Sequence, residues 1–199
     1  MALLTQIIAE QGFEKVRDVI GAVLTTELLN QKTLQGFTED INVYVGRSAP
    51  FQQDETLMIN VLLDSSNYGS MNETDVMGLT NFNIDIFATG KQTTTETGGY
   101  ESSKIRDKFL GMCRSILQST IYRTLGLPPG LIGGTYCENF EVFDSPNAND
   151  SAFTSMARLN FSVRILENQE LWQGVTVADS FTSVKLDLTE KGYQYNLTT

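Results

Sequence analysis

The apolar positions near the start of the chain recur at helical spacing. They are Phe13, Val16, Val19, Ile20, Val23, Leu24 and Leu28, and their steps follow one face of a 3.6-residue helix. This pattern predicts a helix over most of the first thirty residues. Gly12 separates it from a shorter leading piece. The leucines and isoleucines of residues 1–11 indicate that this piece packs on the domain or on another subunit.

Farther along, apolar and polar residues alternate, which is the pattern of strands. Strands are predicted at residues 41–45, 56–63, 82–86, 138–144 and 157–165, with weaker ones at 174–178 and 181–188. In the strand at 157–165 every second residue is apolar, and it pairs most simply with 138–144 as a hairpin. The turn-rich stretches 64–78 and 88–99 are predicted as loops, and the residues from Glu190 as a polar tail.

A second amphipathic helix is predicted from Gly98 to Leu125, between the strands. Its apolar line runs through Ile105, Phe109, Met112 and Ile116, and the charged residues Lys104, Arg106, Lys108 and Arg114 are placed on the solvent side. Ser102 or Ser103 is the expected N-cap. Gly126 and the prolines after it end the helix, and residues 127–134 (LPPGLIGG) are predicted as a loop.

The order of elements is a helix, three strands, a helix, a hairpin and a trailing β segment. Because strands and helices do not alternate regularly, the predicted fold class is α+β, with a mostly antiparallel sheet packed against a long central helix and an N-terminal helix. Residues 1–166 are predicted to form this domain. Residues 167–199 are predicted as a C-terminal β extension or arm.

Composition narrows the classes of function. The chain has 199 residues, enough for one domain, and a formal net charge of −10, which disfavours sequence-specific binding of DNA or RNA. It has no histidine, so the Ser-His-Asp and Cys-His arrangements and most zinc sites are excluded. The N-terminus lacks the pattern of a signal peptide, and no run approaches the ~18 apolar residues of a membrane span. We therefore expect a protein that is made and folded in a cytoplasm.

Candidate chemical sites are few. Cys113 is expected as a buried free thiol, and a disulfide to Cys137 stays open. Residues 64–75 resemble a calcium loop, but Ser66 and Tyr68 occupy ligand positions that require Asp or Asn. The polar cluster of residues 144–150 is explained by turn chemistry. Gly98-Gly99 before a helix suits a hinge better than an anion site, because Glu96 and Glu101 flank it. No catalytic, cofactor-binding or metal-binding residue is predicted.

Three features in sequence order carry a resemblance to a known family. They are an N-terminal helix reading FEKVRDVIGAVL from Phe13, a Thr/Gly-rich loop before a helix that opens YESSKIR at Tyr100, and the hairpin of 138–144 with 157–165. In this order and texture, residues 13–166 resemble the tail terminator (tail completion) proteins of long-tailed bacteriophages. The 64–78 stretch and the segment after Leu166 are extra relative to a minimal member, which leaves open another phage neck or connector ring protein.

The resemblance implies a structural virion protein without a cofactor. Its copies would form a hexameric ring that caps the tail tube, binds a neck or head-completion protein, and lets DNA pass through an acidic lumen. In that family surfaces do the work, so the loops beside the second helix become the candidate interfaces. They are Lys91, Gln92, Thr93, Thr94, Thr95 and Glu96 before the helix, and Leu131 and Ile132 after it. Residues 1–11 or 167–199 would be arms.

Two other classes stay open. One is a monomeric, non-enzymatic ligand-binding module, and the other is an enzyme of unfamiliar type that uses Asp or Glu with a metal. Paired carboxylates such as Glu39/Asp40 and Glu138/Glu141 have no positioned nucleophile or oxyanion site beside them in the sequence, so solvated charge explains them better.

Overall fold

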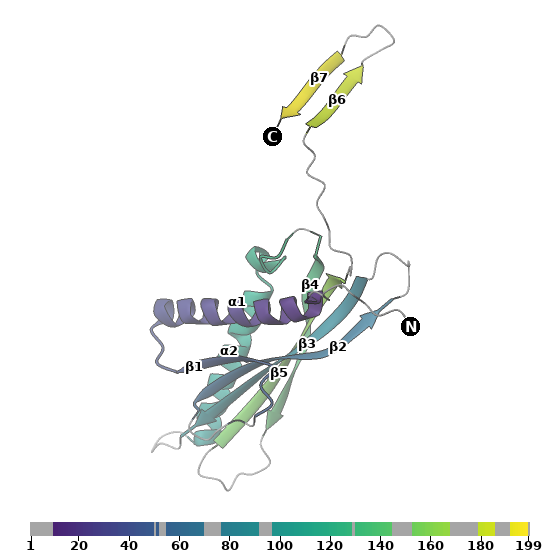
Figure 1. Ribbon diagram of the computed structural model, residues 1–199. Helices are drawn as coiled ribbons and strands as arrows, with labels where there is room; N and C mark the ends of the chain where they lie inside the picture. The colour runs from purple at the N-terminus through teal and green to yellow at the C-terminus, as the bar shows by residue number, and fades with distance from the viewer. Residues whose placement is uncertain are drawn as a thin grey trace, which may run out of the picture. The chain divides into compact units, whose positions relative to one another are not determined.

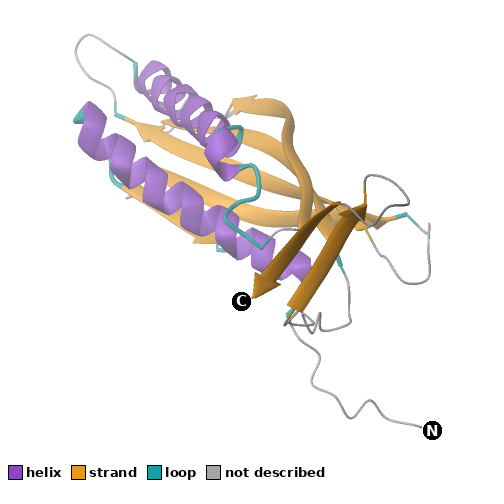
Figure 2. Cartoon of the chain, turned by 90° about the horizontal axis from the view of Figure 1, so that it is seen from above, coloured by secondary structure: helices purple, strands orange, loops and turns teal. Residues whose placement is uncertain are grey.

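Two helices, α1 (Gly12–Gln35) and α2 (Gly98–Leu117), lie over one face of a five-stranded sheet (Figures 1 and 2). The computed structural model describes residues 10–49, 51, 55–69, 77–91, 97–128, 130–144, 153–167, 179–185 and 192–198. The chain divides into two compact units, Met1–Gln169 and Glu170–Thr199, and each is described by itself. The larger unit contains both helices and the five-stranded sheet.

The sheet is mixed, and most of its pairings are antiparallel. Its strands are β1 (Ile41–Val45), β2 (Leu57–Tyr68), β3 (Met77–Gly90), β4 (Ile132–Asp144) and β5 (Phe153–Leu166). They are arranged in the order β1-β2-β3-β5-β4. Only the pairing of β1 with β2 is parallel among these described strands. The predicted α+β class, the mostly antiparallel sheet and the hairpin of β4 with β5 are confirmed.

The core lies between the helices and the sheet. Every second residue of the first half of β2, of the second half of β3 and of most of β5 is buried in it, as the alternation predicted. From the helices, α1 contributes Val16, Ile20, Leu24 and Leu28, and α2 contributes Phe109, Leu110, Cys113 and Leu117. With 24 residues against 20, α1 is longer than α2. The two helices therefore cover the sheet together, rather than one central helix alone.

The opposite face of the sheet is partly covered as well. The ring of Phe51, between β1 and β2, stacks on Phe87 of this face with centroids 5.6 Å apart. Asn60 donates to the Arg47 carbonyl at 2.8 Å and accepts from the Arg47 N–H at 3.1 Å. This two-way bond holds the backbone after β1 on β2. Asn60 and Met58, which is paired with Phe87, are buried although they point away from the helices.

Two strands are longer than their sequence pattern predicts. β2 continues to Tyr68 and β3 begins at Met77, so the predicted loop 64–78 is wrong at both of its ends. Residues 70–76 of that stretch lie outside the described residues. A register shift between Leu63 and Ser65 marks the point where the sequence alternation is lost while the pairing continues. Polar residues can continue a strand whose ladder is already established.

The boundaries of α2 also differ from the prediction. The N-cap is Thr97, whose side chain accepts a hydrogen bond from the Tyr100 N–H, and neither Ser102 nor Ser103 caps the helix. The helix ends at Leu117 and not at Leu125. Ser119 has extended backbone angles, and its hydroxyl accepts from the Ile121 N–H to start a short 3₁₀ turn, Thr120–Tyr122. The side chain is thus satisfied outside the helix, which favours termination there.

The N-terminus of α1 is held by residues from both ends of the larger unit. The Glu167 carboxylate, just after β5, accepts from the Gly12 N–H at 2.8 Å and from the Phe13 N–H at 2.9 Å. Gln11 and Glu14 add a capping box. Because the first N–H groups of a helix have no partner within it, this carboxylate joins the start of α1 to the end of the sheet.

The smaller unit contains an antiparallel hairpin. It consists of β6 (Asp179–Lys185) and β7 (Gly192–Thr198), paired from Asp179 with Thr198 to Lys185 with Gly192. The predicted polar tail from Glu190 is therefore wrong over β7. The predicted strand at 181–188 corresponds in part to β6, and the one at 174–178 lies outside the described residues.

Candidate interaction surfaces

The predicted loop before α2 has a tightly packed base. The last residues of β3, including Gly90, approach the first turn of the helix so closely that a Cβ on Gly90 would stand 2.1 Å from the Gly98 carbonyl oxygen. The Lys91 N–H donates to the Glu101 carboxylate at 2.7 Å, and Thr97 caps the helix. Residues 88–90 belong to β3 and 98–99 to α2, which shortens the predicted loop of 88–99 to residues 91–97.

Of the predicted interface residues before α2, the structure places only one. Lys91 is exposed at the base of the loop. Gln92, Thr93, Thr94, Thr95 and Glu96 lie outside the described residues, so their role stays a prediction. The close contacts at Gly90, Lys91 and Thr97 define where this loop leaves the domain.

After α2, the expected exposure of Ile132 is wrong, and the interface role of Leu131 and Ile132 stays a prediction. Ile132 is only 9% exposed and belongs to the core as the first residue of β4. Leu131 is half-buried, and its carbonyl accepts a hydrogen bond from the Leu166 N–H at 2.9 Å. The LPPGLIGG stretch therefore docks against the end of β5. Its glycines had suggested an exposed loop, but this pairing draws the two apolar residues inward.

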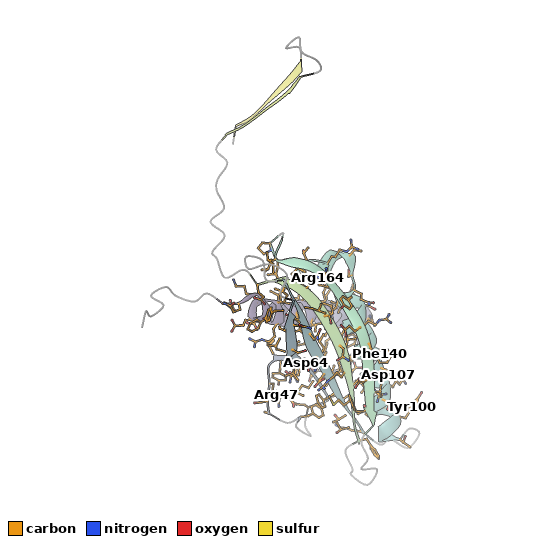
Figure 3. The ribbon with its side chains drawn as sticks, turned by 90° about the vertical axis from the view of Figure 1, so that its right-hand side faces the viewer. Arg47, Asp64, Tyr100, Asp107, Phe140 and Arg164 are labelled. Carbon is orange, nitrogen blue, oxygen red and sulfur yellow. The ribbon has the colours of Figure 1, made fainter. Side chains whose placement is uncertain are left out.

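The prominent exposed apolar surface lies on β4, at the outer edge of the sheet. Four large side chains of this strand are exposed: Tyr136, Phe140, Val142 and Phe143. Phe140, labelled in Figure 3, is 51% exposed although it is paired with the buried Leu159 of β5. α2 contacts part of β4, but these four side chains stay exposed. We call these four side chains the β4 edge patch.

Sequence reasoning placed Phe140 and Val142 on one side of a strand and did not identify that strand as an exposed edge. The adjacent pair Val142-Phe143 carries the information that was missed. Neighbouring strand residues point to opposite faces, so a strand with one solvated face does not require two large apolar residues in succession. Only the strand order shows that this segment is an edge.

The sheet face opposite the helices carries a network of polar side chains. The Asn83 amide donates to the Asp64 carboxylate at 3.0 Å, and Ser162 donates to the Asn81 side-chain oxygen at 2.8 Å. On the same face, Arg158 binds Asp85 through two hydrogen bonds. These groups satisfy one another across β2, β3 and β5. These polar side chains have partners on neighbouring strands, so their presence on this face is explained without a ligand.

A shallow groove runs between the two helices on their outer side. Its volume is about 540 Å³, and its lining includes Glu27, Met112, Ile116, Ile121 and Tyr122. The Tyr122 hydroxyl donates to the Glu27 carboxylate, and that bond raises the pKa of Tyr122. The lining also includes Gln31, Gln35 and Lys108, and its one carboxylate, Glu27, is already engaged by the tyrosine.

The thiols are unsuited to chemistry. Cys113 and Cys137 are both free. Burial raises the pKa of Cys113 to about 12 and that of Cys137 to about 11, so neither forms a thiolate near neutral pH. Among the described residues, no group of three or more His, Cys, Asp or Glu side chains could hold a metal ion. Within the same residues, no helix is long and apolar enough to cross a membrane.

Arg106 is the largest departure from the predicted solvent face of α2. Its side chain is 7% exposed, and it hydrogen-bonds to Asp107 at 2.9 Å. The buried stripe is rotated by about one position from the predicted one, because α2 packs against β3, β5 and β4 at once. Ile105, Met112 and Ile116 are only half-buried as a result.

Comparison with known proteins gives little more. No family model matches the sequence, and no curated protein matches it. One similar solved structure is a chain of the "Virion of native gene transfer agent (GTA) particle", with a TM-score of 0.45 and 16% sequence identity. The likeness covers 73% of this chain and 93% of that chain. Neither a family nor a function follows from a likeness of this strength.

Proposed function

We propose that this chain is a structural virion subunit that assembles with copies of itself into a ring at the head–tail junction of a long-tailed phage. The ring caps the tail tube and joins it to the neck. The observation that carries this proposal is the β4 edge patch. An exposed, long and apolar edge strand is a liability in a monomer and is normally covered by another chain.

The position of the patch suits a ring. β4 is at one edge of the sheet, and the other edge is β1, which has only five residues. The two edges therefore differ, and a contact between β4 and some other surface of the next copy is head-to-tail. Head-to-tail contacts close into rings when the rotation between copies permits it. The resemblance to tail terminators suggests six copies.

The remaining surfaces fit the same proposal. The loop of residues 91–97 leaves from a fixed base, which suits contact with a tail tube or an adjacent ring. Residues 92–96 are the proposed contact. The net charge of −10 gives a surface that lets DNA pass through a lumen without binding it. In this proposal the protein acts by assembly and has no catalytic role.

Sedimentation velocity of the purified chain tests the proposal. We expect a closed oligomer of the 22.1 kDa chain, and a shift to monomer in Phe140→Lys/Val142→Lys, which places two cations on the edge. The control is Leu34→Lys/Ile121→Lys, which changes two apolar residues on the helical side that are even more exposed, at 70% and 78%, and should leave the oligomer intact. A chain that stays monomeric at high concentration and also fails to bind purified tail tubes contradicts the proposal.

A further inference from the structure

We propose that the β6–β7 hairpin of one copy adds to the β4 edge of the next copy and extends its sheet. This inference rests on the proposed function, since it names the partner of the β4 edge patch in the ring. It is argued from the regularity of β4, the apolar side chains on both of its faces, and the incompleteness of the hairpin.

The second half of β4 is a regular edge whose charged residues, Glu141 and Asp144, are all acidic. Both register shifts against β5, at Ile132/Gly134 and at Cys137/Asn139, lie in the first half of the strand. Residues 139–144 pair with β5 without interruption. The sequence of β4 contains neither lysine nor proline, the residues that commonly guard an edge against pairing. Bulges blunt the first half, whereas the second half can accept another strand.

An added strand would find apolar neighbours on both faces of the sheet. Phe140 and Val142 are paired with the core residues Leu159 and Ala157, so they lie on the face that the helices cover elsewhere. Phe143 is paired with Met156 on the opposite face. Directly opposed residues share a face, and cross-strand neighbours supply much of the stabilisation of a sheet. A new strand would therefore meet Phe140 and Val142 on one face, and Phe143 beside Glu141 on the other.

The hairpin lacks what a stable sheet requires. β6 and β7 pair with each other, and a two-stranded hairpin alone is marginally stable in water. Each strand has seven residues, enough to span the six uninterrupted residues of β4 at 139–144. Adding the hairpin to β4 would place its strands in a larger sheet with a covered face. The main-chain hydrogen bonds gained would pair the free edge of β4 with one edge of the hairpin.

A second copy is the partner that fits ring assembly. Residues 167–178 join β5 to β6, and a chain of that length spans at most about 40 Å, which is enough to reach an adjacent subunit. A hairpin that added to its own β4 would occupy the edge and leave nothing for a neighbour. Donation to the next copy also fills every β4 and uses every hairpin, and unlike self-addition it links successive copies, as a closed ring requires.

Two complementary variants test this contact. Phe140→Lys/Val142→Lys keeps the hairpin and loses the acceptor edge. Thr182→Pro/Tyr195→Pro changes two residues that are paired within the hairpin, and so removes the donor while it retains the β4 edge. We expect each variant alone to be monomeric, and the equimolar mixture to form a one-to-one heterodimer by sedimentation velocity, since only one of the two possible contacts can form.

The outcomes separate this inference from the proposed function. Rings that persist in the proline variant overturn the hairpin contact and leave ring assembly standing, as does a mixture that stays monomeric while the wild-type chain forms rings. A wild-type chain that does not assemble overturns the proposed function and, with it, this contact. Circular dichroism and thermal melting of each variant establish that the larger unit is folded in every sample.

Discussion

Asp85 and Arg158 stand directly opposite each other on β3 and β5, and two hydrogen bonds of 2.7 and 2.8 Å join the carboxylate to the guanidinium. They lie on the sheet face that points away from the helices. The side chain of Asp85 is 5% exposed, whereas that of Arg158 is 32% exposed. The pair therefore joins one buried charge to another that reaches water.

This asymmetry makes the two alanine substitutions unequal. Arg158→Ala leaves a buried carboxylate without its partner and should lower the free energy of unfolding by about 3 kcal/mol. Asp85→Ala leaves a guanidinium that water can still solvate, so about 1 kcal/mol is expected. Urea denaturation measures both. An Asp85→Ala loss that equals or exceeds the Arg158→Ala loss would show that the exposure of the partners does not decide the cost.

Gly90 should not tolerate even the smallest side chain. A Cβ there would meet main-chain atoms of α2, the Gly98 carbonyl oxygen at 2.1 Å and the Ser102 nitrogen at 2.5 Å. Gly90→Ala should therefore destabilise by about 1–3 kcal/mol, as overpacking does. The matched control is Gly111→Ala within α2, where a Cβ has open space and should stabilise by about 1 kcal/mol. Thermal melting should move in opposite directions for the two variants.

Glu167 is predicted to stabilise α1 from outside the helix. Glu167→Ala removes both acceptors of the Gly12 and Phe13 N–H groups and should cost about 1–3 kcal/mol in urea denaturation. Glu10→Ala removes a carboxylate from an exposed position near the same helix end and should change stability by less than about 0.5 kcal/mol. Equal effects would mean that charge near the helix end, and not the two hydrogen bonds, is what matters.

The buried thiol of Cys113 predicts a loss of stability at alkaline pH. Its folded pKa is raised to about 12, above an ordinary value of 9.0, so between these values the unfolded chain binds fewer protons than the folded one. The free energy of unfolding should then fall with rising pH, by up to about 1.4 kcal/mol per pH unit from this group. The stabilising contribution is complete below pH 9. In Cys113→Ala, the free energy of unfolding, measured by urea denaturation at several pH values between 9 and 11, should fall less steeply with pH than in the wild-type chain.

The loop before α2 predicts a separation of folding from function. Replacing residues 92–96 with Gly and Ser at equal length keeps Lys91 and Thr97, which contact the start of α2. We expect an unchanged melting temperature and a loss of tail joining in a particle-assembly assay. Deleting 91–97 altogether would also remove the N-cap of α2, so it would test stability as well as assembly. Normal particle assembly with the replaced loop would remove it from the proposed interfaces.

The elements with strong periodicity were predictable. The apolar steps from Phe13 to Leu28 identified α1, and the alternation from Ala157 to Ile165 identified β5, because both patterns reflect contacts with one core. Element ends were less predictable. Thr97 caps α2 through its side chain, and Ser119 begins the turn that follows the helix. Other Ser and Thr residues nearby have the same hydroxyl group, so the sequence does not show which of them takes each role.

The α+β class, the helix α1, the β4–β5 hairpin and the buried Cys113 could be predicted from the residues alone, because helical and strand periods record which side chains avoid water. The three-dimensional arrangement was needed to show that β4 is an edge strand, that Phe140 is exposed while Ile132 is buried, and that Asp85 faces Arg158. Strand order sets these relationships. It depends on pairings between residues far apart in the chain, and local periodicity carries no record of them.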